Sequence, residues 1–151
     1  MDKNNVRQCM VQRVLTALVL LLLALPAAAQ QQELTAADRT AIQTIIERQL
    51  EAFRNDDAVG AFTFASPAIR AKFGTPEQFM TMAQTAYQPV YRPRHVAFKE
   101  LRLVEGVPTQ TVLLVGPDGV PVMALYVMQK QPDGAWKIDG CSLMSFKGER
   151  L

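Results

Sequence analysis

The sequence has very few of the side chains on which most reactive sites depend. It contains one histidine and two cysteines, whereas a zinc site takes three or four Cys, His or carboxylate ligands at regular spacing. Glycine-rich phosphate loops, nucleophile-elbow serines and acidic calcium loops are also missing. We therefore expect no metal and no cofactor, and the sequence identifies no catalytic residue.

The first 29 residues have the three regions of a secretory signal. Lys3, Arg7 and Arg13 precede an apolar run at 14–25, and small residues follow it at 26–29. Even 14–29 is shorter than the roughly 20 residues that span a bilayer. We predict that residues 1–29 are a cleaved signal peptide, that the protein is periplasmic or secreted, and that no stable membrane insertion remains.

The charge balance of the predicted mature chain excludes some classes of partner. Removal of residues 1–29 takes away three of the 16 basic and one of the 14 acidic side chains, which leaves equal numbers. The alkaline pI near 8.7 of the full chain therefore gives no reason to expect nucleic acid as a partner. Residues 30–151 have the size of a single domain, and Cys141 alone cannot form a disulfide within it.

The first half of that domain has helical patterns with recognisable starts. Thr35 and Asp38 are spaced as a capping pair, and apolar residues recur at three- and four-residue intervals over 42–53. Two later starts combine a hydroxyl cap with proline at the first helical position, at Ser66-Pro67 and Thr75-Pro76. The last helix is expected to end by Tyr87.

The segment between the helices and the strands contains two prolines. Pro89 and Pro93 lie in "YQPVYRPRHV", and proline lacks the amide that regular structure uses. We expect residues 87–94 to be irregular.

From His95 onward the pattern is extended. "GPDG" at 116–119 and "QPDG" at 131–134 are typical of type I hairpin turns with a bulge. They divide the segment into four strands at roughly 95–105, 109–116, 120–130 and 135–146, and no strand is visible between the early helices.

The alternation of apolar residues changes phase in two of these strands. The change falls at Lys99-Glu100 and again at Asp139-Gly140, and a β-bulge at each place explains it. Bulges at matching places would bend the sheet strongly. We predict an α+β fold in which N-terminal helices pack on the concave face of a bent four-stranded antiparallel sheet, like a cone.

The stretches that carry this pattern resemble a known superfamily. They are "LTAADRTAIQTIIERQLEAFRNDDA", "FASPAIRAKFGTPEQF", "YQPVYRPRHVAF" and "QPDGAWKIDGCSL". The chain is similar to the nuclear-transport-factor-2-like (cystatin-like) superfamily, and within it to a bacterial exported family without an assigned function. The resemblance implies the cone fold but not an activity, because the superfamily includes isomerases, dehydratases, transport factors and binding domains.

Cys141 has two possible roles. A nucleophilic cysteine needs a base and an electropositive setting, but His95 lies in another strand and Asp139 disfavours a thiolate. We predict that Cys141 is a buried core residue that reacts slowly with thiol reagents.

One cluster is a candidate ligand site. Tyr87, Tyr91, Arg92, Arg94 and His95 follow one another at the junction of helices and sheet. Aromatic faces and guanidinium groups can hold a small anion or the polar end of an amphipathic ligand. Because this junction lies near the mouth of the predicted cone, we expect a non-catalytic domain that binds a small or lipid-like ligand or a protein partner there.

Two alternatives to that site are open. In one, the connection is only structural, its tyrosines pack on the helices, and its arginines are solvated or pair with Glu100 or Glu105. In the other, the protein is a small isomerase- or dehydratase-like enzyme that uses Asp139 with Tyr91 or Tyr126.

The middle strands have apolar residues at both odd and even positions, so both faces of the sheet are predicted to be covered. Residues 112–115 and 122–128 are apolar throughout, whereas helices cover one face of a sheet. Large apolar patches are uncommon on monomers. We therefore expect a homodimer through the outer sheet face.

Overall fold

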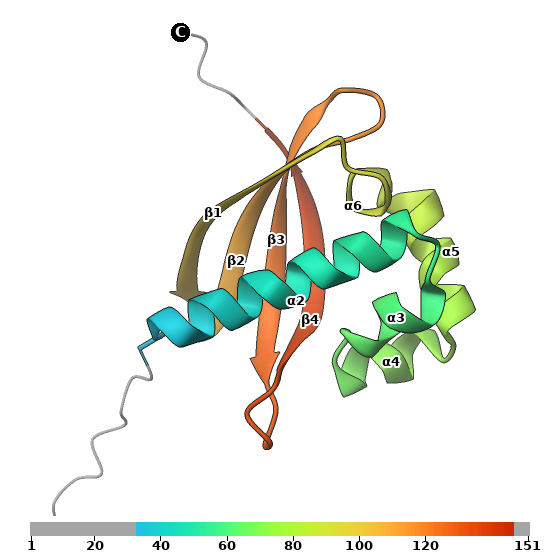
Figure 1. Ribbon diagram of the computed structural model, residues 1–151. Coiled ribbons are helices and arrows are strands. Elements are labelled where there is room, and N and C mark those ends of the chain that lie inside the picture. The colour runs from blue at the N-terminus through green and yellow to red at the C-terminus, as the bar shows by residue number, and fades with distance from the viewer. Residues whose placement is uncertain (1–32, 147–151) are drawn as a thin grey trace, which may run out of the picture. The chain divides into compact units, whose positions relative to one another are not determined.

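A computed structural model describes residues 33–146, and the predicted signal peptide lies outside this range. The helices are α2 (Ala36–Arg54), α3 (Ala58–Thr63), α4 (Pro67–Phe73), α5 (Pro76–Ala86) and α6 (Gln88–Tyr91), and the strands are β1 (His95–Val104), β2 (Val107–Val115), β3 (Pro121–Lys130) and β4 (Trp136–Ser145) (Figure 1). The fold is α+β, as predicted. Within the described residues, no helix is long and apolar enough to cross a membrane.

The predicted helix starts are confirmed. The Thr35 hydroxyl accepts from the Asp38 amide at 3.0 Å, and the Asp38 carboxylate accepts from the Thr35 amide at 3.1 Å, which is a reciprocal capping box. The Ser66 and Thr75 hydroxyls cap α4 and α5 by accepting from the Ile69 and Gln78 amides, each with proline following and without the reciprocal bond. These ends form locally, so the sequence alone specifies them.

The segment 87–94 differs from the prediction, because residues 88–91 form α6. Pro89 lies in the first turn of this helix, where an amide has no acceptor within the helix and its loss costs nothing. Pro93 follows the helix, so it does not interrupt it.

The sheet is an antiparallel meander in the order β1-β2-β3-β4. Both predicted hairpin turns are present, and Gly119 and Gly134 take the left-handed conformation (φ +79° and +86°) that these turns require. The turn between β1 and β2 places Glu105 and Gly106 at positive φ.

Both predicted bulges are present. Phe98 pairs with Val112 but Leu101 pairs with Gln110, so β1 has one extra residue at Lys99-Glu100. In the same way, Val127 pairs with Gly140 and Met128 with Ile138, which leaves Asp139 as the extra residue of β4. Each bulge changes which residues face the helices.

One face of the sheet packs on the helices. Ala124, Tyr126 and Met128 of β3 are buried in the same apolar core as Ile42, Ile46, Leu50 and Phe53 of α2, which runs across that face (Figure 1). The alternate residues Met123, Leu125 and Val127 are half-buried on the opposite, outer face.

A short backbone pairing joins the helical half to the outer edge of β4. Ala65 forms a parallel bridge with Ile138. The Ile138 amide donates to the Phe64 carbonyl at 2.9 Å, and the Ser66 amide donates to the Ile138 carbonyl at 2.8 Å. This single bridge is all that stands in place of a strand between the early helices.

Candidate functional site

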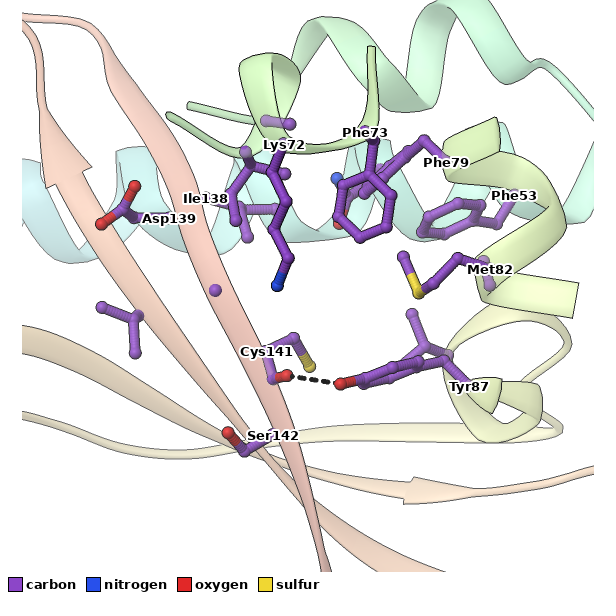
Figure 2. Close-up of a pocket in the computed structure, with 17 residues that line it drawn as sticks. Phe53, Lys72, Phe73, Phe79, Met82, Tyr87, Ile138, Asp139, Cys141 and Ser142 are labelled. Atoms are coloured by element: carbon purple, nitrogen blue, oxygen red, sulfur yellow. Dashed lines mark hydrogen bonds between the residues drawn. The ribbon is translucent and has the colours of Figure 1, made fainter. Parts of the chain in front are cut away.

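A cavity of about 490 Å³ lies between β4 and the helices α2, α4 and α5 (Figure 2). Its apolar lining includes Phe53, Ile69, Phe73, Phe79, Met82 and Ile138, and its polar lining includes Gln49, Lys72, Tyr87, Asp139, Cys141 and Ser142. Ligand sites are commonly cavities of about 300–1,000 Å³ with mainly apolar walls and a few polar groups. We take this pocket as the candidate site.

The apolar wall is built around Phe79 of α5. Its ring lies 5.7 Å from Phe53, 5.5 Å from Phe62 and 5.4 Å from Phe73, measured between centroids. These distances and tilted geometries are favourable for aromatic pairs. Each partner comes from a different helix, so the ring cluster fixes the spacing of the helices that form the wall.

Lys72 supplies the positive charge at the pocket. Its exposed side chain extends from α4 into the space between Phe73 and Cys141 (Figure 2), and its Nζ lies 5.6 Å from the Phe73 ring centroid. A cation over an aromatic face is favourable by about 0.5–1 kcal/mol at exposed sites. The pocket therefore combines an apolar wall with a group that attracts an anion.

Asp139 is held by a structural contact. The Ser66 hydroxyl donates to the Asp139 carboxylate at 2.5 Å and accepts from the Ile69 amide at 3.1 Å. The bulge residue of β4 is thereby tied to the cap of α4. This chain of contacts sets the distance between the strand and the helix that line the pocket.

Cys141 packs against the core as a half-buried residue that also lines the pocket, so the predicted burial is only partial. The bulge at Asp139 turns its side chain to the helix face, beside the cavity. Burial nevertheless raises the pKa of the thiol to about 12, which disfavours the thiolate that a nucleophile needs.

Two buried polar atoms lie in the same row of the sheet. Gln110, Tyr126 and Cys141 are cross-strand neighbours, and the Tyr126 hydroxyl and Gln110 Oε1 have no hydrogen-bond partner among the described residues. Burial raises the pKa of Tyr126. Tyr126 does not line the pocket, so it does not join Asp139 there as a catalytic pair.

Of the predicted cluster, only Tyr87 lines the pocket. Its hydroxyl donates to the Cys141 carbonyl at 3.1 Å, which is the dashed bond in Figure 2. Arg94 and His95 are exposed, and the Arg94 amide donates to the Val115 carbonyl at 2.8 Å. Tyr87 therefore lies at the pocket, whereas Arg94 and His95 do not line it although they are close in sequence.

Tyr91 and Arg92 contact Asp56 instead. The Tyr91 hydroxyl and the Arg92 guanidinium both donate to that carboxylate, the latter at 2.7 Å, and Arg92 also donates to the Arg54 carbonyl at 2.6 Å. The hydrogen bond from Tyr91, followed by the charge of Arg92, lowers the pKa of Asp56. The hydrogen bond with Tyr91 and the nearby Asp56 charge also raise the pKa of Arg92.

In the structural alternative the arginines are solvated or pair with Glu100 or Glu105, whereas Arg92 pairs with Asp56. Glu100 pairs with Arg102 at 3.1 Å on the same strand. Asp56 is the partner because it takes a left-handed conformation (φ +54°) after α2, which directs its carboxylate toward α6. Sequence spacing gives no signal for a contact between residues this far apart.

Lys72 and the helical wall were not predicted as site residues. They lie on α2, α4 and α5, where the spacing of apolar residues predicts that a helix packs but not that it lines a pocket. Within the described residues, no group of three or more His, Cys, Asp or Glu side chains is placed to hold a metal ion.

Comparison with known proteins places the chain in a family. Residues 35–151 match the family described as a domain of unknown function, DUF4864, and the chain belongs to it. No curated protein matches the chain.

Proposed function

We propose that this member of a family without an assigned function is an exported, non-catalytic binding domain whose pocket receives an apolar group with a negative charge beside it. The observation that carries the proposal is the cavity of about 490 Å³ with an aromatic wall and Lys72 in its lining. Such a group can belong to a small or lipid-like ligand or to a protein partner.

This proposal moves the ligand site from the predicted junction to the pocket. Tyr87 is common to both, whereas Tyr91 and Arg92 are engaged with Asp56. Binding is favoured over an isomerase- or dehydratase-like reaction because the pocket carboxylate, Asp139, is bonded to the helix cap Ser66.

The proposal includes the cone of the nuclear-transport-factor-2-like superfamily, with the pocket at its mouth. The two bulges support a bent sheet, since a bulge bends its strand and increases the local twist. An experimental structure with a flat sheet would contradict this part of the proposal.

Binding of 1-anilinonaphthalene-8-sulfonate, an apolar fluorescent anion, tests the pocket. The protein is produced from the full-length chain and titrated with the dye. Met82→Trp should abolish binding by filling the pocket, while Thr81→Trp, at the exposed neighbouring position outside the lining, should leave it unchanged. Equal effects of the two variants would contradict the proposal.

A matched pair of charge-reversal variants tests the role of Lys72 in binding. Lys72→Glu should weaken dye binding several-fold because it replaces attraction by repulsion, whereas Arg70→Glu makes the same charge change on α4 outside the pocket lining. Native mass spectrometry of the purified protein would in addition report any ligand that it retains.

A further inference from the structure

β4 is an edge strand that is covered over only part of its length. Ile138 pairs with the segment 64–66 through two backbone hydrogen bonds. Beyond it, residues 141–145 form backbone pairs with β3 and with no other segment of residues 33–146. Apart from the Tyr87 hydroxyl on the Cys141 carbonyl, no residue of the described part of the chain bonds to the outer side of this stretch, which leaves residues 142–145 open to a further strand.

The alternation of an antiparallel ladder identifies which backbone groups face outward. The Cys141 carbonyl accepts from the Tyr87 hydroxyl, so it points away from β3. Because the two backbone groups of a residue point to the same side and the side alternates along a strand, the amides of Cys141, Leu143 and Ser145 face outward. These three amides lie at every second residue, which is the spacing at which an added strand would accept hydrogen bonds from β4.

The two edges of the sheet differ in how they are protected. β1 carries a bulge and the charged residues Lys99, Glu100 and Arg102, which are features that prevent strand addition at natural edges. Residues 140–146 of the other edge contain no charge and no proline, and Met144 and Phe146 are 54% and 43% exposed. An unprotected edge of this kind is suited to pairing.

The pocket adjoins this same edge. Ile138, Gly140 and Cys141 of β4 line it, and Cys141 faces the helices because it pairs with the buried Tyr126. The side chains of an added strand also alternate between the two faces. Every second side chain of an added strand would therefore face the helices, on the side where the pocket lies.

We propose that the edge of β4 at residues 140–145 binds an extended segment of a partner protein by strand addition. Backbone hydrogen bonds to β4 give affinity, and side-chain pockets give specificity. An apolar side chain of the segment enters between Phe73, Phe79 and Met82, and an acidic side chain lies near Lys72. The inference rests on the proposed function, because the same pocket receives the apolar group.

Random heptapeptides displayed on phage, selected on protein produced from the full-length chain, provide the probe. The most enriched peptide is synthesised unmodified and in two forms that carry N-methyl groups on alternate amides. In strand addition only every second amide of the peptide bonds to β4. Methylation of that set should lower the affinity at least tenfold, about 1.4 kcal/mol, while methylation of the other set should have little effect. Equal effects of both phases, or no enriched peptide, would overturn the proposal.

Two measurements on the protein locate the contact. The amides of Cys141, Leu143 and Ser145 should become protected from hydrogen exchange when the peptide binds. Ser145→Pro removes an outward amide without removing a bond to β3 and should weaken binding, whereas Ser145→Ala keeps the amide and should not. Protection elsewhere, or equal affinity of the two variants, counts against strand addition.

The dye and the peptide separate this inference from the proposed function. Dye binding that depends on Met82 and Lys72, without peptide pairing at β4, would leave the pocket proposal standing and refute strand addition. Failure of both probes would refute both.

Discussion

At the scale of single residues, Cys141 shows how burial controls reactivity. A pKa of about 12, raised by burial from an ordinary value near 9, leaves roughly a thousandfold less thiolate at neutral pH. We expect the native protein to react with Ellman's reagent at least about a hundredfold more slowly than the urea-unfolded chain. Equal rates in the two states would show that the thiol is freely accessible and ionisable.

Asp38 gives a prediction about acid stability. The hydrogen bond from Lys130 Nζ at 2.9 Å, followed by those from Thr35, holds the pKa of this carboxyl well below its usual range. As the pH falls through about 4, the unfolded chain takes up the proton before the folded protein does. The stabilisation is therefore present above that pH and is lost as the pH falls toward the lower pKa of the folded state.

We expect Asp38→Asn to flatten the dependence of the urea midpoint on pH between about pH 5 and 2. Glu47→Gln, an exposed charge change on the same helix, is the control and should leave the slope unchanged. Identical pH profiles for Asp38→Asn and the unmodified protein would contradict the assignment.

The two roles of Asp38 differ in how far the sequence predicts them. Its capping contact with Thr35 spans three residues and follows from spacing alone. Its bonds to Lys130 and to the Trp136 indole join residues 92 and 98 positions apart. No local pattern encodes such pairs, and the same holds for Asp56 with Arg92.

At the scale of elements, the link between Ser66 and Asp139 sets the position of α4 against β4. Ser66→Ala removes both the helix cap and the hydrogen bond to Asp139 at a fully buried position. We expect a loss of about 1–2 kcal/mol in the free energy of unfolding, measured by urea denaturation.

Thr75→Ala is the matched control. Thr75 caps α5 through one hydrogen bond to the Gln78 amide and is exposed, so its loss should cost about 0.5–1 kcal/mol. If Ser66→Ala costs no more than Thr75→Ala, the contact with Asp139 contributes nothing to stability.

Helix starts, hairpin turns and both bulges were predictable because each depends on a few neighbouring residues or on the parity of one strand. The pocket was not predictable in this way. Its wall needs Phe53, Phe73 and Phe79 to meet from three helices, and the parallel bridge at Ala65 forms only once the helical half has docked on β4.

At the scale of the whole molecule, the outer face of the sheet supports the expected homodimer. Leu113, Val115, Met123 and Leu125 are half-buried there, and Met144 adds exposed apolar surface. The alternative cover, the C-terminal segment 145–151, lies largely outside the described residues. We expect sedimentation at micromolar concentrations to report a dimer, since a twofold contact is self-limiting.

Leu125→Glu should shift that equilibrium to the monomer, because it places a charge on the apolar surface. Gln78→Glu adds the same side chain at an exposed position of α5, away from the outer sheet face, and should leave the dimer intact. A monomeric mass for the unmodified protein at all concentrations would refute the dimer.

The contacts of Asp38 also bear on the order in which the chain completes its fold. Asp38 of α2 accepts hydrogen bonds from Lys130 and Trp136, which lie at the end of β3 and the start of β4, on either side of the last turn. During synthesis, nearly the whole chain must therefore be made before α2 can form these contacts. Contacts of such long sequence separation slow folding, so we expect the docking of α2 against the last hairpin to be a late step in folding.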